Sequence, residues 1–257
     1  MKTLIVIPAR YASTRFPGKP LALLGGEAMV SRVWHRAKEV PGADDVMVAT
    51  DDERIYNHVV GFGGEAAAMM TSTEHRSGTD RCGEVMQRLE AQHKHYDVVI
   101  NIQGDEPFLD PEQVEQLVEC FDNPDVEIAT LATRIKSKEE LLSPNNVKVV
   151  CSHDGNALYF SRQAIPYCRG CEVEEWLDHY AYFKHVGIYA FRSDVLAGVC
   201  RLQPAALEEC EKLEQLRWLD AGYKIMVCHT EHSNIGIDTP EDLAEAEKQL
   251  FNESKKL

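Results

Sequence analysis

Apolar and polar positions follow a strand-then-helix rhythm over most of the chain. Continuous apolar runs at 3–8, 45–50 and 97–103 have the character of strands buried on both faces. Helical spacing of apolar residues occurs at 29–39, 53–60, 79–92, 111–121, 204–221 and 240–254, and two further strands are expected at 126–134 and 224–229. This alternation predicts a mixed, mostly parallel, doubly wound α/β sheet of the Rossmann-like kind, covered by helices.

The rhythm changes near residue 145. Segments 147–152 and 156–160 flank His153-Asp154-Gly155, and Asp-Gly is a strong signal for a hairpin turn. Another β run follows at 184–191. We therefore expect a single domain over residues 1–257 that carries an inserted antiparallel β segment at about 145–195.

Composition places the chain among ordinary globular proteins. It has 257 residues, of which 44% are hydrophobic and 27% charged, so disordered, collagen-like and coiled-coil classes are excluded. Acidic residues number 42 against 27 basic ones, a net charge of −15, which argues against nonspecific binding to nucleic acid or to an anionic membrane. No apolar run approaches the roughly 18 residues of a membrane span, and no targeting segment is visible. We expect a cytoplasmic protein.

The cysteines predict reduced thiols. Eight are scattered along a chain that is long enough to fold without a disulfide framework. Cys168 and Cys171 form a CxxC, but a second ligand pair for zinc is missing and the surroundings are not the strand-to-helix turn of a redox motif. We interpret this pair as incidental, and His93 and His95 as a solvated helix end.

The first loop is unusually basic for an acidic chain. No acidic residue occurs before Glu27, whereas Arg10, Arg15 and Lys19 follow the first strand. The loop leaves the carboxyl end of that strand, where α/β sheets bind their ligands, and arginine and lysine suit a polyphosphate. Neither common phosphate motif is present, because Gly18-Lys19 precedes a proline and no GxGxxG opens a helix. A solvated basic loop is the alternative.

Carboxylates mark two other positions. Asp105 ends a strand predicted to be central, where a carboxylate can hold Mg²⁺ or simply stand in a turn. At the start of the last helix, Thr239, Pro240 and Asp242 are explained as an N-cap, a first helical residue and a capping-box acid. Asp238 is left unexplained by that interpretation.

Many of these segments closely resemble one enzyme family. The string IPARYASTRFPGKPL (7–21) resembles the N-terminal signature of the 3-deoxy-manno-octulosonate cytidylyltransferases, also called CMP-Kdo synthetases. The resemblance continues, in the family's order, through VATDD (48–52), HRSGTDR (75–81), NIQGDEP (101–107), PNNVKVV (144–150), ALYFSRQAIPY (157–167), KHVGIY (184–189), LEQLRWL (213–219) and GIDTPEDL (236–243). It therefore spans nearly the whole chain.

The resemblance implies a role for each matching position. Asp105 is the principal magnesium ligand and Asp238 the second, and Arg10, Lys19 and Asp105 are the catalytic residues. CTP-binding residues are Pro8, Ala9, Arg10, Ser13, Arg15, Lys19, Arg76, Ser77, Gly78 and Gln103. Independently of the resemblance, Thr79 is alternatively explained as the N-cap of the helix that follows this loop. Kdo-binding residues are Arg162, His185, Tyr189, Glu214 and Gln215, with Glu211, Glu214 and Gln215 expected on one helical face. Arg162 is equally well explained as a structural residue.

The family further implies a reaction and an assembly. The reaction is transfer of CMP from CTP to the anomeric 2-hydroxyl of 3-deoxy-D-manno-octulosonate (Kdo), with Mg²⁺ as cofactor, in lipopolysaccharide biosynthesis. An 8-amino Kdo analogue or sialic acid is an alternative acceptor, and a noncatalytic nucleotide-binding regulator is an alternative of another class. Family members are dimers, and aromatic residues, which favour interfaces, gather in the 145–195 segment, so we expect a homodimer.

Overall fold

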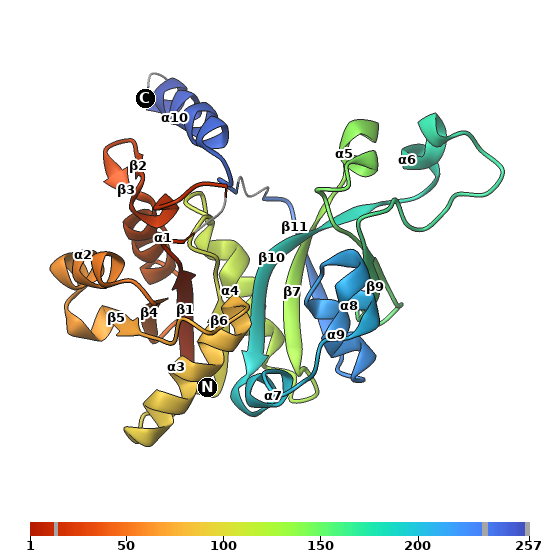
Figure 1. Cartoon of the computed structure of the whole chain (residues 1–257). Helices are drawn as coiled ribbons and strands as arrows, with labels where there is room; N and C mark the ends of the chain where they lie inside the picture. The colour runs from red at the N-terminus through yellow and green to blue at the C-terminus, as the bar shows by residue number, and fades with distance from the viewer. Residues whose placement is uncertain (13–14, 233–235, 255–257) are drawn as a thin grey trace. The chain divides into compact units, whose positions relative to one another are not determined.

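Strand β1 (Thr3–Ala9) is buried along its whole length, as its unbroken apolar sequence requires. In the computed structural model, which describes residues 1–12, 15–232 and 236–254, it lies at the centre of the first of two units (Figure 1). The first unit comprises Met1–Glu115 with Asn234–Leu257, and the second comprises Gln116–Ser233. Across these described ranges, no helix is both long and apolar enough to cross a membrane.

The first unit contains a parallel sheet in the strand order β6-β1-β4-β5. Its other strands are β4 (Asp45–Thr50), β5 (Ala68–Met70) and β6 (Val98–Asn101). The connecting helices are α1 (Met29–Lys38), α2 (Glu53–Gly63) and α3 (Gly78–Ala91). The chain runs outward from β1 to β5 and then returns to β6 on the other side of β1. Because such crossovers are right-handed, α3 covers the opposite face from α1 and α2, and a topological switch point lies between β1 and β6.

Short elements and the last helix complete this unit. They are η1 (Lys19–Leu21), the hairpin β2 (Leu23–Leu24) and β3 (Glu27–Ala28), η2 (Glu65–Ala67) and α10 (Pro240–Ser254). A small apolar cluster joins the hairpin to the start of α10 through Leu24, Met29, Ile237 and Ala246, with Phe16 packed against it. This cluster brings the segment after residue 236 to the first loop.

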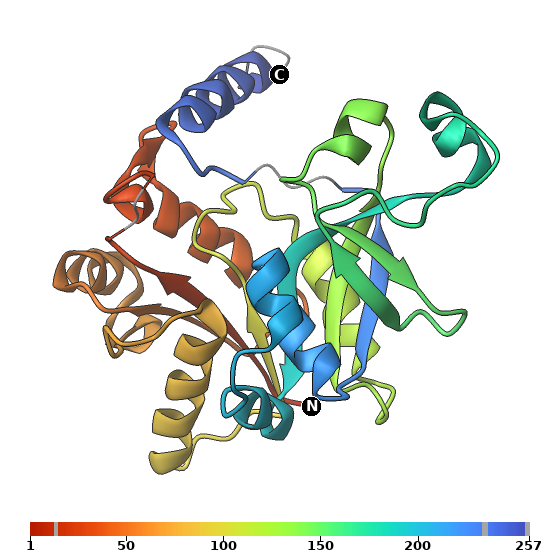
Figure 2. The same ribbon diagram turned by 45° about the vertical axis from the view of Figure 1, so that its right-hand side comes forward.

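The second unit contains a mixed sheet in the order β11-β7-β10-β8-β9. Its strands are β7 (Ile128–Arg134), β8 (Lys148–Cys151), β9 (Ala157–Ser161), β10 (Phe183–Arg192) and β11 (Ile225–Thr230). Its helices are α5 (Lys138–Leu142), η3 (Val173–Glu175), α6 (Trp176–His179), α7 (Ser193–Val199), α8 (Ala206–Glu211) and α9 (Gln215–Asp220), and α4 (Pro111–Cys120) leads into the unit. Figures 1 and 2 show the connection from β9 to β10 as a long loop that carries α6.

The predicted fold class is confirmed. Parallel pairing joins β6, β1, β4 and β5 as well as β11 and β7, and the antiparallel part is β7–β10–β8–β9. The Asp154-Gly155 turn joins β8 to β9 as expected, with Gly155 at φ 79°. Strand β10 pairs with β7 over most of its length, so the 145–195 segment shares its sheet with the rest of the second unit.

One predicted helix is wrong. The segment 204–221 is two short helices, because Lys212 adopts a left-handed conformation (φ 54°) after α8 and α9 begins only at Gln215. The spacing of apolar residues cannot reveal such a break, because one left-handed residue changes the direction of the chain without changing that spacing.

Candidate active site at the ends of β1 and β6

A cleft of about 370 Å³ opens at the carboxyl ends of β1 and β6, at the topological switch point of the first unit. Three cations and one carboxylate face it, and the first loop and the segment after β6 supply most of its walls. Eight of the predicted site residues line it: Pro8, Ala9, Arg10, Arg15, Lys19, Gly78, Gln103 and Asp105. Ser13 lies outside the described residues, and Arg76 and Ser77 lie beside the cleft on the 72–78 loop.

The first loop ends in a turn that only glycine fits well. Gly18 has φ 75°, and its N–H donates to the Tyr11 carbonyl at 2.9 Å. A Cβ at this position would lie 3.0 Å from Cζ of the Tyr11 ring. The Arg54 guanidinium lies over the same ring, 3.3 Å from its centroid, and Asp52 fixes Arg54 through two side-chain hydrogen bonds. The turn therefore places Lys19 at a defined position.

Lys19 lies between two carboxylates. Its Nζ is 2.6 Å from Oδ2 of Asp105 and 3.2 Å from Oδ1 of Asp238. Arg15 contacts the other oxygen of Asp238 at 3.0 Å. The Lys19 side chain is only 12% exposed, whereas that of Arg15 is 66% exposed, so the ammonium is the better shielded of the two cations. Two acids predicted from distant parts of the sequence are thus brought to one point.

A capping box positions Asp238. Asp242 accepts from the N–H groups of Asp238 (3.0 Å) and Thr239 (2.8 Å), and the Thr239 hydroxyl accepts from the Asp242 N–H at 3.1 Å. The predicted cap at the start of α10 is therefore confirmed. Ile237 donates its N–H to the Asp105 carbonyl at 3.0 Å, which ties the two acidic segments together. The Asp238 carboxylate is not used by the cap and faces the cations.

The two carboxylates also fit a divalent cation. Because both contact the same ammonium, their oxygens lie no farther apart than the sum of the two distances, 5.8 Å. Carboxylate oxygens are the hard ligands that magnesium prefers, usually one or two of them together with phosphate oxygens and water. Asp105 and Asp238 are thus the residues of this cleft that would hold such an ion.

Arg10 is anchored by the 72–78 loop. Its guanidinium donates to the carbonyl of His75 and, at 3.4 Å, to that of Ser77. Burial, followed by the neighbouring charge of Arg81, lowers the pKa of Arg10 from its ordinary value, yet arginine stays protonated at any physiological pH. Arg10 therefore presents a fixed positive charge to the cleft.

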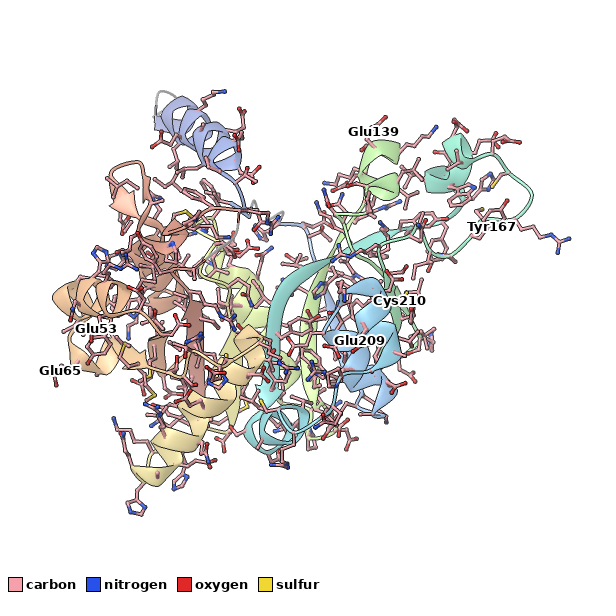
Figure 3. The ribbon with its side chains drawn as sticks, in the orientation of Figure 1. Glu53, Glu65, Glu139, Tyr167, Glu209 and Cys210 are labelled. Carbon is pink, nitrogen blue, oxygen red and sulfur yellow. The ribbon has the colours of Figure 1, made fainter. Side chains whose placement is uncertain are left out.

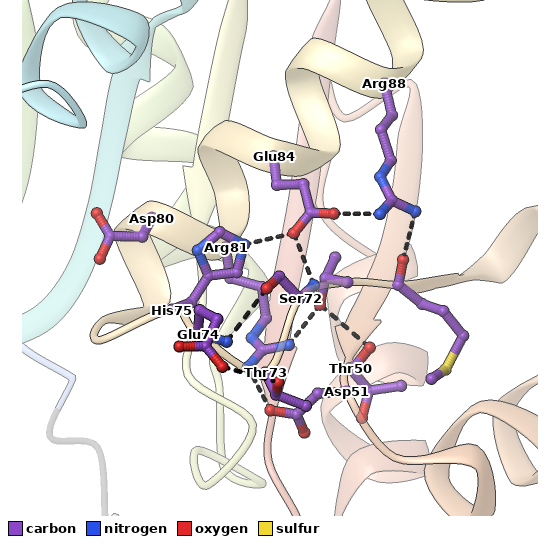
Figure 4. Close-up of polar contacts among 12 residues, drawn as sticks. Thr50, Asp51, Ser72, Thr73, Glu74, His75, Asp80, Arg81, Glu84 and Arg88 are labelled. Carbon is purple, nitrogen blue, oxygen red and sulfur yellow. Dashed lines mark hydrogen bonds and ion pairs between the residues drawn. The ribbon is translucent and has the colours of Figure 1, made fainter.

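A polar network holds that loop against α3 (Figure 4). Glu84 accepts from the Ser72 N–H at 2.8 Å and contacts the His75 ring and Arg88. Burial alone would raise the pKa of Glu84, but the Ser72 and His75 hydrogen bonds outweigh it and lower that pKa. Arg81, fully buried, pairs with Asp51 at 2.7 Å. The loop is therefore rigidly placed beside the cleft.

The N-cap of α3 is Ser77, so the alternative explanation of Thr79 as the cap is wrong. Ser77 Oγ accepts from the Asp80 N–H at 3.1 Å, and the Asp80 carboxylate accepts from the Ser77 N–H at 3.3 Å. Thr79 is buried one residue inside the helix. Gly78 begins the helix, and a Cβ there would lie 3.2 Å from the Pro8 ring and 3.3 Å from Nε2 of Gln103. The helix start approaches β1 and β6 closely because the residue is glycine.

Sequence reasoning missed part of this wall. Gly104 also lines the cleft, and a Cβ on it would lie 3.1 Å from the Pro8 carbonyl oxygen. Asn101 accepts from the Gln103 side chain at 3.2 Å and so orients Gln103, which is predicted to bind CTP. Both residues lie within the NIQGDEP segment, and an asparagine at the end of an otherwise apolar strand was the available signal.

The predicted acceptor residues all lie in the second unit. Arg162, directly after β9, donates to the carbonyls of Glu211 (2.8 Å), Pro144 (3.0 Å) and Lys212 (3.4 Å). These bonds hold the loop before β8 and the end of α8 against β9. They support the structural explanation of Arg162, while its part in binding Kdo stays a prediction.

His185 and Tyr189 are neighbours on β10, where a bulge lies between Val186 and Tyr189. Thr130 donates to the Ile188 carbonyl at 2.7 Å and contacts Nε2 of His185 at 2.9 Å. His185 keeps a little exposed surface, but burial of its ring lowers its pKa to about 3, so it is neutral. The buried Tyr189 hydroxyl has no hydrogen-bond partner among the described residues, and burial and the nearby Glu214 raise its pKa.

Glu211, Glu214 and Gln215 do not share a helical face. Glu211 ends α8 and accepts from the Ser161 hydroxyl (2.6 Å) and the Arg162 N–H (3.0 Å). Glu214 and Gln215 lie at the start of α9, beyond the left-handed Lys212. The expected shared face is therefore wrong, while Glu214 and Gln215 themselves stay candidates.

Comparison with known protein families gives one consistent match. The family model described as cytidylyltransferase matches residues 4–225. That stretch includes the first loop, both predicted substrate regions and every strand up to the start of β11.

Individual relatives match over the whole chain. The 3-deoxy-manno-octulosonate cytidylyltransferase of Parabacteroides distasonis is 50% identical over 98% of this chain and 99% of its own. The protein of the same name from Bacteroides thetaiotaomicron is 49% identical over 99% and 100%. A solved structure of CMP:2-keto-3-deoxy-manno-octonic acid synthetase complexed with CTP is 43% identical, covers 98% of this chain and all of its own, and superposes with a TM-score of 0.89.

Proposed function

Because the chain belongs to the family of 3-deoxy-manno-octulosonate cytidylyltransferases, we propose that it transfers CMP from CTP to the anomeric 2-hydroxyl of Kdo. The products are CMP-Kdo, for lipopolysaccharide biosynthesis, and pyrophosphate, and we place the reaction in the cytoplasm, where CTP is made. One observation carries the proposal: Lys19 joins Asp105 and Asp238 at the switch-point cleft, beside Arg10 and Arg15.

The triphosphate of CTP is bound by Arg10, Arg15 and Lys19. Arg10 is already fixed by the 72–78 loop, whereas Arg15 and Lys19 exchange carboxylate oxygens for phosphate oxygens when the nucleotide enters. Gln103, Arg76 and the 72–78 loop face the base and ribose. The protein's part is then to align the α-phosphorus for in-line attack and to neutralise charge that develops on the phosphate oxygens.

The cofactor of this reaction is magnesium. Asp105 and Asp238 would hold this ion, which would supply positive charge that lowers the pKa of the attacking hydroxyl and offsets charge on the phosphate. Asp105 is the better shielded ligand, since its side chain is 28% exposed against 46% for Asp238. We therefore expect replacement of Asp105 to lower activity more than replacement of Asp238.

Kdo is bound by Arg162, His185, Tyr189, Glu214 and Gln215 of the second unit. The buried hydroxyl of Tyr189 and the buried indole N–H of Trp218 support a polyhydroxylated ligand here, because neither has a hydrogen-bond partner within the described ranges. The two rings pack edge to face with centroids 4.9 Å apart, so the two side chains are in contact. A neutral His185 offers this ligand a hydrogen bond and no charge.

The working form is a homodimer. Some aromatic residues of the 145–195 segment lie in the core of the second unit, namely Phe160, Trp176 and Tyr182. The exposed apolar side chains of the same segment are Leu158, Tyr167 and Tyr180, and they are the contacts proposed for the partner subunit. Light scattering at micromolar concentration tests this, and a monomer would contradict it.

The reaction is tested by pyrophosphate release from CTP with and without Kdo and Mg²⁺, in wild type, Lys19→Ala and Asp105→Ala. We expect release only with all three components and its collapse in both variants. Release with sialic acid or 8-amino-Kdo in place of Kdo would keep the chemistry and change the acceptor. CTP binding without release with any sugar acid would favour a noncatalytic regulator.

A further inference from the structure

Cys168 and Cys171 lie side by side in the connection between β9 and β10. The Cys171 thiol is directed at Sγ of Cys168, 3.0 Å away, and at the Cys168 carbonyl oxygen, 3.6 Å away. Gly170, at φ 94°, makes the tight turn that brings the two side chains together. A disulfide bond is about 2.05 Å long, so about 1 Å of further approach separates the dithiol from a disulfide.

The pair is accessible and yet packed on a defined surface. Both thiols are half-buried against a small cluster that contains Trp176 and Tyr182, while the intervening Arg169 and Gly170 are exposed. Trp176 donates its indole N–H to the Cys171 carbonyl at 3.4 Å and stacks on Tyr182 with ring centroids 6.2 Å apart. A reagent can therefore reach the sulfurs while their backbone stays in place.

Zinc is the competing ligand for a CxxC pair. A structural zinc site needs four ligands, usually cysteine and histidine. In the described part of the chain, no group of three or more candidate ligands includes either cysteine. Two thiols alone favour thiol–disulfide chemistry over a metal.

We infer that Cys168 and Cys171 are a redox-active dithiol, which a low-molecular-weight disulfide such as oxidised glutathione converts reversibly into an intramolecular disulfide. The resulting disulfide closes a loop that contains Arg169 and Gly170, and it restrains the connection between β9 and β10. This inference is independent of cytidylyl transfer, because its test measures thiols and peptides and not activity.

The geometry assigns an order to the two sulfurs. Cys171 donates its hydrogen to Cys168, and this hydrogen bond raises the pKa of Cys171 to about 11. Because Cys171 keeps its hydrogen in this bond, Cys168 reacts first: it loses its proton to water, attacks one sulfur of the oxidant, breaks that S–S bond and releases one thiolate, which takes up a proton. Cys171 then loses its proton to water and attacks Sγ of Cys168, which expels the second thiolate. Two protein thiols lose two electrons, and one disulfide becomes two thiols.

The test uses the full chain carrying Cys210→Ser, which removes an exposed thiol on α8, labelled beside Glu209 in Figure 3. Seven of the eight cysteines remain. With oxidised glutathione we expect free thiols to fall from seven to five, and dithiothreitol to restore them. Trypsin cuts after Arg162, Arg169 and Lys184, so the disulfide links peptides 163–169 and 170–184. Mass spectrometry distinguishes this product from oxidation of Cys120 with Cys228, another pair in contact.

Single variants test the order of attack. Cys171→Ser should hold a glutathione adduct on Cys168, whereas Cys168→Ser, whose hydroxyl can still accept the Cys171 hydrogen, should give much less adduct on Cys171. Cys171→Ala covers the case in which serine at that position disturbs the apolar cluster. Several results would overturn the inference: glutathione adducts on both cysteines of the parent chain with no linked peptides, equal adducts in the two variants, or one zinc ion per chain that is lost in Cys168→Ser.

Discussion

Lys19 Nζ and Asp105 Oδ2 lie 2.6 Å apart at the mouth of the switch-point cleft. The ammonium also reaches Asp238, so one lysine contacts both acids that a divalent cation would use. Lysine and metal therefore compete for the same oxygens when no nucleotide is present.

Replacing Lys19 by methionine is expected to move two measurements in opposite directions. The rate constant kcat/KM should fall about 100-fold or more, because a preorganised positive group at the phosphates is lost. The affinity for Mn²⁺ without nucleotide, measured by calorimetry, should rise several-fold, because the ammonium no longer competes. Lys19→Arg is the control that keeps the charge. Weaker Mn²⁺ binding in Lys19→Met would show that the carboxylates need the lysine to be held in place.

Gly18→Ala is expected to impair CTP binding specifically. A left-handed conformation costs an alanine about 1–2 kcal/mol, and the new Cβ meets the Tyr11 ring, which is itself in contact with Arg54. Lys19 then shifts, so the KM for CTP should rise. Gly26→Ala is the matched control, because Gly26 has φ 85° and a Cβ there would meet no neighbouring group within 4 Å. It should lose similar stability in thermal unfolding with an unchanged KM, and equal KM values for both variants would contradict the role of the turn.

The sequence predicts the sheet and the cleft because both depend on local signals. Buried parallel strands have unbroken apolar sequences, and ligands bind where such strands end. Lys19 and Asp105 can therefore be predicted as site residues because they follow the ends of β1 and β6 in the sequence. Asp238 lies more than 100 residues later in the sequence. It joins Lys19 and Asp105 because Ile237 and Phe16 pack in one apolar cluster. No local pattern encodes that contact, and the assignment of Asp238 came from family resemblance.

The errors have equally specific causes. Lys212 breaks the helix expected over 204–221 through one backbone angle, which separates Glu211 from Glu214. Ser77 and Thr79 are both good N-cap residues, and only the contact between Ser77 and Asp80 distinguishes them. In both cases the residue types are compatible with the predicted structure, and the backbone conformation determines where each helix begins or ends.

Tyr189→Phe is expected to affect acceptor binding without loss of stability. Its hydroxyl is buried without a partner among the residues described here, so removing it should leave the melting temperature unchanged or raise it. If Kdo accepts or donates a hydrogen bond there, the KM for Kdo should rise about ten-fold while the KM for CTP is unaffected. Tyr182→Phe is the control, because that hydroxyl donates to the Pro166 carbonyl at 2.8 Å. It should lower stability and leave the KM for Kdo unchanged; the same KM in wild type and Tyr189→Phe would remove Tyr189 from the acceptor site.

His185 makes the folded protein less stable in mild acid. Burial lowers its pKa from 6.5 to about 3, so between these values the unfolded chain binds a proton that the native protein does not. The free energy of unfolding is therefore unaffected above pH 6.5 and falls as the pH drops toward 3, by about 1.4 kcal/mol per unit. At pH 5 the loss is about 2 kcal/mol relative to pH 7.5.

His185→Gln should remove this loss, because glutamine does not titrate and can still bond to Thr130. Urea unfolding at pH 5 and pH 7.5 measures it: the difference between the two pH values should be about 2 kcal/mol smaller in the variant. Carboxylates also titrate in this range, but they are the same in both proteins and cancel in the comparison. His153→Gln, at the exposed turn between β8 and β9, is the control and should leave the difference unchanged. An unchanged difference in His185→Gln would mean that the ring accepts a proton in the folded protein, and His185 could then meet the Kdo carboxylate as a cation.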